Sequence, residues 1–185
     1  MRFKNPITLF FSMIAAVLLL SPLLYHLVYK PRRAGTLIER GIVEIRRAAA
    51  DPKRKEIYFA GAESLFRDVE NDYVGNSADF CNAYGDAYLR VSEYDLSLQK
   101  FIRSLSIKRD NPATLFHLGR FFAGMPEDYF NRFNRAPLNR WIVFPRSLSL
   151  KTRQDYALFF YGKSLMAGGD NAEAVKGMRE LLSSR

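Results

Sequence analysis

Two glycines lie 34 residues apart in similar helical contexts, and this spacing restricts the fold more than any other feature. Gly85 is followed three residues later by Tyr88, and Gly119 is followed three residues later by Phe122. Between them, residues 94–105 have the apolar periodicity of an amphipathic helix. No alternating run of apolar and polar residues leads into a hairpin turn, so the sequence predicts an all-α fold made of recurring helix pairs.

This pattern resembles the tetratricopeptide repeat (TPR), a pair of antiparallel helices that recurs every 34 residues. Small Ser97 and Ser104 stand where the family usually has alanine, which lets the two helices of a pair approach closely. A third match begins at Tyr161-Gly162, nine residues later than a regular array would place it. The resemblance therefore implies a TPR-like array of antiparallel helix pairs that contains an irregular insertion.

The resemblance and the helix signals together suggest the extent of this array. We expect it to occupy residues 31–185, with the insertion at about 125–150. Thr36, with Glu39 three residues later, has the spacing of a capping box and predicts the start of a first helix. The helices expected between residues 36 and 71 would cover one end of the array.

The amino terminus carries a second strong pattern, an apolar run. Residues 7–29 include no Asp, Glu, Lys or Arg, and a helix of about 20 apolar residues crosses a bilayer. Lys30 follows directly, without the small-residue site at which a signal peptide is cleaved. We therefore expect residues 1–30 to form an uncleaved, single-pass transmembrane helix.

Basic residues flank both ends of this run and leave its orientation open. Their number on the carboxyl-terminal side favours a cytoplasmic domain by the positive-inside rule. The short basic leader, residues 1–6, instead resembles bacterial signal anchors that export the rest of the chain. We expect the bacterial inner (cytoplasmic) membrane, and we favour a periplasmic domain over a cytoplasmic one.

The resemblance also implies a concave groove that binds a partner protein. In the family's layout the groove-facing positions are Asn82, Asp86, Leu89, Arg90, Phe116 and Arg120. TPR domains that clamp a chaperone's terminal carboxylate have Lys and Asn where this chain has Asn82 and Asp86, so we do not expect a chaperone-tail receptor. The alternative is that these residues are solvated and bind nothing.

Most of the excess positive charge lies in residues 100–153, which hold 11 Lys and Arg against 3 Asp and Glu. Within this stretch arginines alternate with aromatic residues, and the basic and aromatic patch consists of Arg132, Phe133, Arg135, Arg140, Trp141 and Arg146. Such a patch suits an anionic polymer or lipid surface, or a protein interface. Alternatively, the aromatic rings pack under a loop while the arginines remain solvated. We do not expect nucleic acid, because no recognised binding motif accompanies the charge.

The residues give little support to catalysis. The chain has one cysteine and two histidines, too few for the usual zinc sites or disulfide frameworks. Glu127 and Asp128 are adjacent and would point apart on a helix, with no nucleophile nearby in the sequence. We therefore expect no catalytic residue, no cofactor and no metal site.

These patterns together predict a membrane-anchored helical-repeat scaffold. We expect it to bind and organise protein subunits of a bacterial envelope machine, of the secretion, pilus, flagellar-motor or cytochrome-maturation type. The alternative is an adaptor that binds an anionic polymer or lipid surface through the basic, aromatic-rich insertion. Ionic strength distinguishes the two hypotheses, because salt screens contacts between exposed charges much more than apolar contacts.

Overall fold

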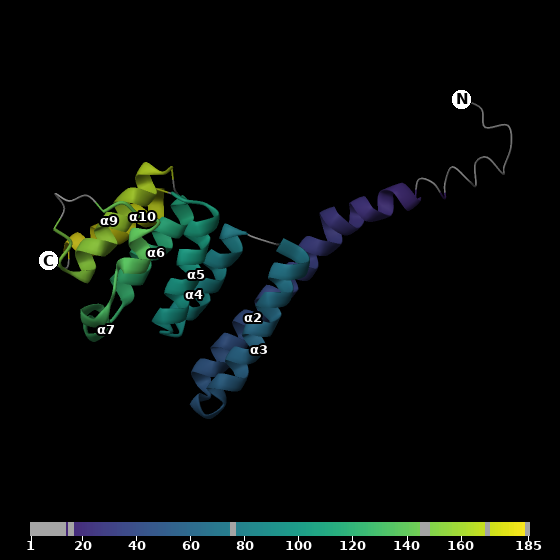
Figure 1. Cartoon of the computed structure of the whole chain (residues 1–185), viewed down its shortest axis with the longest axis horizontal. Helices are drawn as coiled ribbons and strands as arrows, with labels where there is room; N and C mark the ends of the chain where they lie inside the picture. The colour runs from purple at the N-terminus through teal and green to yellow at the C-terminus, as the bar shows by residue number, and fades with distance from the viewer. Residues whose placement is uncertain (1–13, 15–16, 75–76, 145–148, 169–170, 184–185) are drawn as a thin grey trace.

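A computed structural model describes the chain except for residues 1–13, 15–16, 75–76, 145–148, 169–170 and 184–185 (Figure 1). All the secondary structure in the described residues is helical. The elements are η1 (Tyr25–Tyr29, a π-helix), α2 (Lys30–Ala50), η2 (Pro52–Arg54), α3 (Lys55–Asp68), η3 (Val69–Val74), α4 (Ala78–Arg90), α5 (Tyr94–Ile107), α6 (Pro112–Gly124), α7 (Glu127–Arg132), α8 (Ala136–Asn139), α9 (Arg153–Met166) and α10 (Asn171–Ser183).

The predicted transmembrane helix at residues 1–30 is wrong. Within the described part of the chain, no helix has the length and apolar character needed to cross a membrane. The continuous described apolar segment is residues 17–29, shorter than the roughly 20 residues that a bilayer requires. At Lys30 the helix continues as α2, in which charged residues alternate with apolar ones. Residues 1–13 and 15–16 of the predicted anchor lie outside the described residues.

A long antiparallel hairpin, α2 and α3, opens the folded body. Its helices touch closely at Gly41, where a Cβ atom would lie 2.6 Å from Cζ of Phe66. The expected helix start at Thr36 is wrong, because Thr36 lies inside α2 and its hydroxyl donates a hydrogen bond to the Arg32 carbonyl at 3.1 Å. The helix continues upstream without a break, so no cap is needed at that residue.

The second pair, α4 and α5, is joined by a turn of three residues. A Cβ atom on Gly85 would lie 2.5 Å from Cε1 of Phe101, so the bare glycine is what allows the ring to sit against α4. Near the other end of the pair, the Ser104 hydroxyl donates to the Ala78 carbonyl at 3.0 Å. A small side chain on one helix and a ring on the other thus set the distance between them.

The third pair consists of α6 and α9, and it repeats the contacts of the second. A Cβ atom on Gly119 would lie 2.5 Å from Cδ1 of Tyr161, and the Ser164 hydroxyl donates to the Pro112 carbonyl at 2.8 Å. Both residues on α6 lie 34 positions after their counterparts on α4, and both residues on α9 lie 60 positions after their counterparts on α5. The second and third pairs therefore share one register.

The difference between 34 and 60 locates the extra residues. They lie in the connection between α6 and α9, inside a helix pair, and they include the short helices α7 and α8. We call residues 125–152, between α6 and α9, the insertion. The sequence match at Gly162 does not mark a close approach, because a Cβ atom there would meet nothing within 4 Å. Instead, α9 is the second helix of the pair that begins with α6, and α10 packs on its far side.

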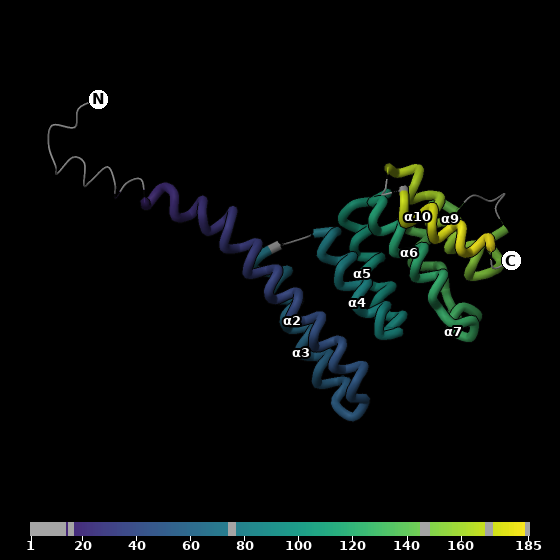
Figure 2. The backbone as a smooth tube through the Cα atoms, turned by 180° about the vertical axis from the view of Figure 1, so that it is seen from behind, coloured from purple at the N-terminus to yellow at the C-terminus, as the bar shows by residue number. Residues whose placement is uncertain are grey.

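The pairs stack side by side and bury two apolar clusters. One cluster joins α2, α3 and α4, and the other joins α5, α6, α9 and α10 with the insertion. Figure 2 shows α4, α5, α6, α9 and α10 as neighbouring rods, with α2 and α3 extending past them. This stack leaves the first helices of adjacent pairs, α4 and α6, next to each other.

Candidate functional site

Asp86 is the centre of an ion-pair cluster between α4 and α6. Its carboxylate accepts a hydrogen bond from Nε of Arg90 at 2.7 Å and another from Nη1 of Arg120 at 2.5 Å. Nδ1 of His117 lies 3.5 Å from Oδ1 of the same carboxylate. Asp86 and Arg90 come from α4, whereas His117 and Arg120 come from α6, so the cluster joins two successive helix pairs.

The cluster keeps Asp86 ionised. Burial alone would raise the pKa of this carboxyl group, but the neighbouring His117 and Arg90 and the charge of Arg120 outweigh burial and hold the pKa below its ordinary value. Two guanidinium groups therefore face one carboxylate, which leaves a net positive charge. The carboxylate also fixes the positions of both arginines before any ligand arrives.

An open pocket of about 460 Å³ lies beside this cluster. Arg90 and Arg120 line it together with Leu89, while Ala123 and Gly124 come from the end of α6. The remaining lining residues are Ser92, Tyr94 and Tyr161. Burial raises the pKa of Tyr161 to about 12, although the charge of Arg120 opposes the shift, so its phenol is neutral at pH 7. We call this space the groove pocket.

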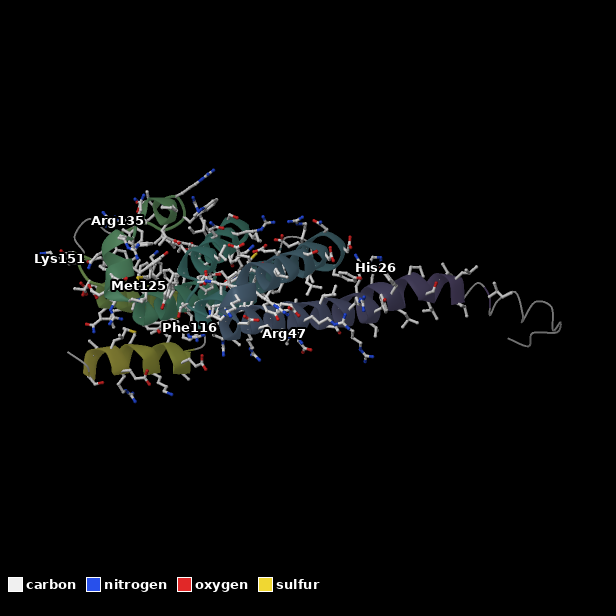
Figure 3. All side chains as sticks on the ribbon, turned by 90° about the horizontal axis from the view of Figure 1, so that it is seen from below. His26, Arg47, Phe116, Met125, Arg135 and Lys151 are labelled. Atoms are coloured by element: carbon white, nitrogen blue, oxygen red, sulfur yellow. The ribbon has the colours of Figure 1, made fainter. Side chains whose placement is uncertain are left out.

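The structure thus brings together three of the six expected groove residues, Leu89, Arg90 and Arg120, at one pocket. Asn82 lies one turn before Asp86 but is only 3% exposed, and among the described residues neither of its side-chain polar atoms has a hydrogen-bond partner. Phe116 packs against the ring of Tyr161, with 5.8 Å between the centroids. Figure 3 shows it within the helical body.

Sequence reasoning missed two lining residues, Tyr94 and Tyr161. A signal for Tyr161 exists in the sequence: Ala157, Tyr161 and Ser164 have the same spacing as Ser97, Phe101 and Ser104. Aligning these two sets would have assigned α9 to the third pair. No comparable pattern marks Tyr94, which reaches the pocket from the first residue of α5.

A second pocket, of about 410 Å³, lies where the insertion meets α5. Its lining residues are Asp95, Leu98, Tyr129, Arg132, Phe133, Asn134 and Pro137. Two members of the predicted basic and aromatic patch, Arg132 and Phe133, are therefore here. We call this space the insertion pocket.

The other patch residues lie elsewhere on the insertion. Nη1 of Arg135 contacts the Tyr156 hydroxyl at 3.4 Å, and Figure 3 places Arg135 at the end of the molecule opposite His26. The guanidinium of Arg140 lies over the ring of Trp141, 5.2 Å from its centroid. Arg146 lies outside the described residues.

Other chemistry has little material in the described residues. They contain no group of three or more His, Cys, Asp or Glu side chains that could hold a metal ion. Cys81 is buried, and burial raises the pKa of its thiol, which disfavours the reactive thiolate.

Comparison of the chain with protein-family models, with curated proteins and with solved structures finds no match. The geometry of the two pockets is therefore the basis of the functional argument.

Proposed function

We propose that this protein is a TPR-like scaffold that binds a segment of a partner protein at the groove between α4 and α6. The observation that carries the proposal is the groove pocket. Its wall contains two arginines from successive helix pairs, both held by the buried Asp86. The shared register of the second and third pairs supports the helical-repeat part of the proposal.

The chemistry of the pocket suits binding. Guanidinium groups stay protonated at all physiological pH values and donate hydrogen bonds in a fixed planar arrangement. Asp86 is already engaged by both of them, so it is poorly suited to remove a proton from a ligand. Leu89, Tyr94 and Tyr161 supply apolar surface beside these charges, a combination common at the centre of protein interfaces. We infer that the protein organises subunits of a larger assembly and catalyses no reaction.

Crosslinking followed by affinity purification from the source cells tests this proposal. The variant is Arg90→Ala, whose side chain is 60% exposed and can be removed without opening the core. The matched control is Arg67→Ala, an exposed arginine on α3 that lines neither pocket. We expect a stoichiometric partner that is retained by the wild type and the control and depleted with Arg90→Ala. Equal recovery with all three proteins would contradict the groove as the binding surface.

A second candidate function rests on the insertion and its flanking arginines. Arg109 and Arg140 both lie over Trp141, at 5.8 and 5.2 Å from the ring centroid, and within the described chain neither has a carboxylate within 4 Å. Such cations beside a partly exposed ring suit an anionic polymer or lipid surface. Retention on heparin that falls steeply with salt, and that is abolished in Arg109→Glu with Arg140→Glu, would favour this function.

A further inference from the structure

The two pockets are neighbours, separated by one pair of tyrosines. Tyr94 lines the groove pocket and Tyr129 lines the insertion pocket, and their ring centroids are 5.0 Å apart. The Tyr94 hydroxyl donates to the Gly124 carbonyl at 3.3 Å, and the Tyr129 hydroxyl donates to Asp95 at 2.6 Å. One ligand that passes over these two rings would therefore reach both pockets.

The insertion is fastened where it forms its pocket. Besides the bond from Tyr129 to Asp95, Nη1 of Arg153 donates to the Ala123 carbonyl at 2.7 Å and Nε contacts Glu127 at 3.2 Å. Phe133 packs edge-on against Phe122 of α6, with 5.2 Å between the centroids. Because these contacts hold the insertion against the helix pairs, little ordering is required when a ligand binds.

The lining of the insertion pocket combines apolar surface with one available cation. Leu98, Phe133 and Pro137 provide the apolar part. The side chain of Arg132 is 76% exposed, and its carboxylate partner Asp128, itself 78% exposed, lies 3.7 Å away. Such a loose, hydrated ion pair contributes little and is easily exchanged for another carboxylate. Asp95, in contrast, is engaged by the Tyr129 hydroxyl.

We propose that the two pockets together bind one extended acidic segment of the partner protein. An acidic side chain of that segment lies against Arg90 and Arg120 in the groove pocket. An aliphatic or aromatic side chain enters the insertion pocket, with a second acidic side chain near Arg132. This inference rests on the proposed function, and it adds the insertion as a binding surface and the chemistry of the segment. The net charge of residues 100–153, with 11 basic against 3 acidic residues, favours the same partner.

Selection from a random dodecapeptide phage library on the full-length protein tests the proposal. Enriched peptides are synthesised with a fluorescein label, and their Kd is measured by fluorescence anisotropy. We expect them to contain Asp or Glu on both sides of an aliphatic or aromatic residue. Replacing that apolar residue by alanine should weaken binding to the wild type about tenfold, a typical effect for a buried anchor.

Three variants and one control locate the binding surface. Pro137→Glu and Arg132→Glu change exposed residues of the insertion pocket, Arg90→Ala changes the groove pocket, and Arg67→Ala is the control. We expect about tenfold weaker binding to each of the three variants and less than twofold change with the control. In Pro137→Glu, the alanine replacement in the peptide should cost little further affinity, because the two changes remove the same contact.

The outcomes separate this inference from the function on which it rests. Peptides that are weakened by Arg90→Ala but bind Pro137→Glu and Arg132→Glu as tightly as the wild type would overturn the role of the insertion and leave the groove function intact. Enrichment of basic or uncharged peptides would overturn the acidic partner. If the wild type enriches no peptide, or if the enriched peptides bind Arg90→Ala unchanged, the groove function itself fails.

Discussion

Asp86 and Arg120 occupy equivalent positions in successive helix pairs, 34 residues apart, and their ion pair bridges those pairs. The carboxylate is largely buried, so its charge is tolerated only because two guanidinium groups and His117 surround it. The pair could not be predicted from the sequence, since the expected groove layout gives positions on helices but not which side chains meet. What the periodicity does reveal is that both residues recur at one register.

The ionisation of Asp86 predicts a pH dependence of stability. Its pKa is lower in the folded than in the unfolded protein. The carboxylate therefore stabilises the fold above about pH 4, its ordinary value, and this contribution is lost as the pH falls from there toward the folded-state pKa. Asp86→Asn lacks the contribution at every pH. In urea unfolding at pH 7, 5 and 3, we expect wild type and variant to differ most at pH 7 and to converge toward pH 3. A constant difference would contradict the assignment.

Gly85 makes a second residue-scale prediction. In Gly85→Ala the new methyl group would meet the Phe101 ring at 2.5 Å, and overpacking of this kind costs about 1–3 kcal/mol of the free energy of unfolding. The control is Gly61→Ala in α3, where a Cβ atom meets nothing within 4 Å. That change should instead stabilise the protein, by about 0.5–1 kcal/mol. Urea unfolding measures both, and equal effects would refute the close contact.

Among the elements, the insertion shows where sequence reasoning reached its limit. The helical character could be predicted, because apolar residues recur with the helical period, and so could the contact types of α4 and α5. The match at Gly162 misplaced α9 because it treated the extra residues as lying between pairs. The close approach of Gly41 to Phe66 went unnoticed because α2 and α3 are longer than the other pairs. Their spacing therefore departs from 34.

The hydrogen bond of Tyr129 leads to an element-scale prediction. Tyr129→Phe removes the 2.6 Å bond to Asp95, which holds α7 against α5. Such a bond contributes about 1 kcal/mol, so local opening of α7 should become several times more frequent. Amide hydrogen exchange of residues 127–132 should accelerate, while α4 and α5 remain protected. Tyr58→Phe on α3 serves as the control and should leave α7 unchanged. Unaltered exchange in α7 would show that other contacts fasten it.

For the whole molecule, the folded body and the helix before it make separate contributions. The two apolar clusters contain no residue from 17–29, and the described large apolar side chains of that segment are at least 42% exposed. Those residues therefore bury little surface within this chain. The stability of the helix pairs should depend on residues from α2 onward.

Removal of residues 1–29 tests this separation. We expect the remaining chain to unfold in urea at the same midpoint and with the same slope as the full-length protein, since the slope follows the surface exposed on unfolding. Helicity per residue within α2 to α10 should also be unchanged by circular dichroism. A midpoint lower by more than about 0.5 M would show that the removed segment packs on the helix pairs.

The position of the insertion has a consequence for protein engineering. In the second pair, residues 91–93 join the two helices, and the third pair keeps the same register across a connection that is far longer. The long connection is thus a cassette: it can be excised for a three-residue turn, or exchanged for another loop, without moving the helices that flank it. Recognition could then be reprogrammed on a constant chassis by loop grafting.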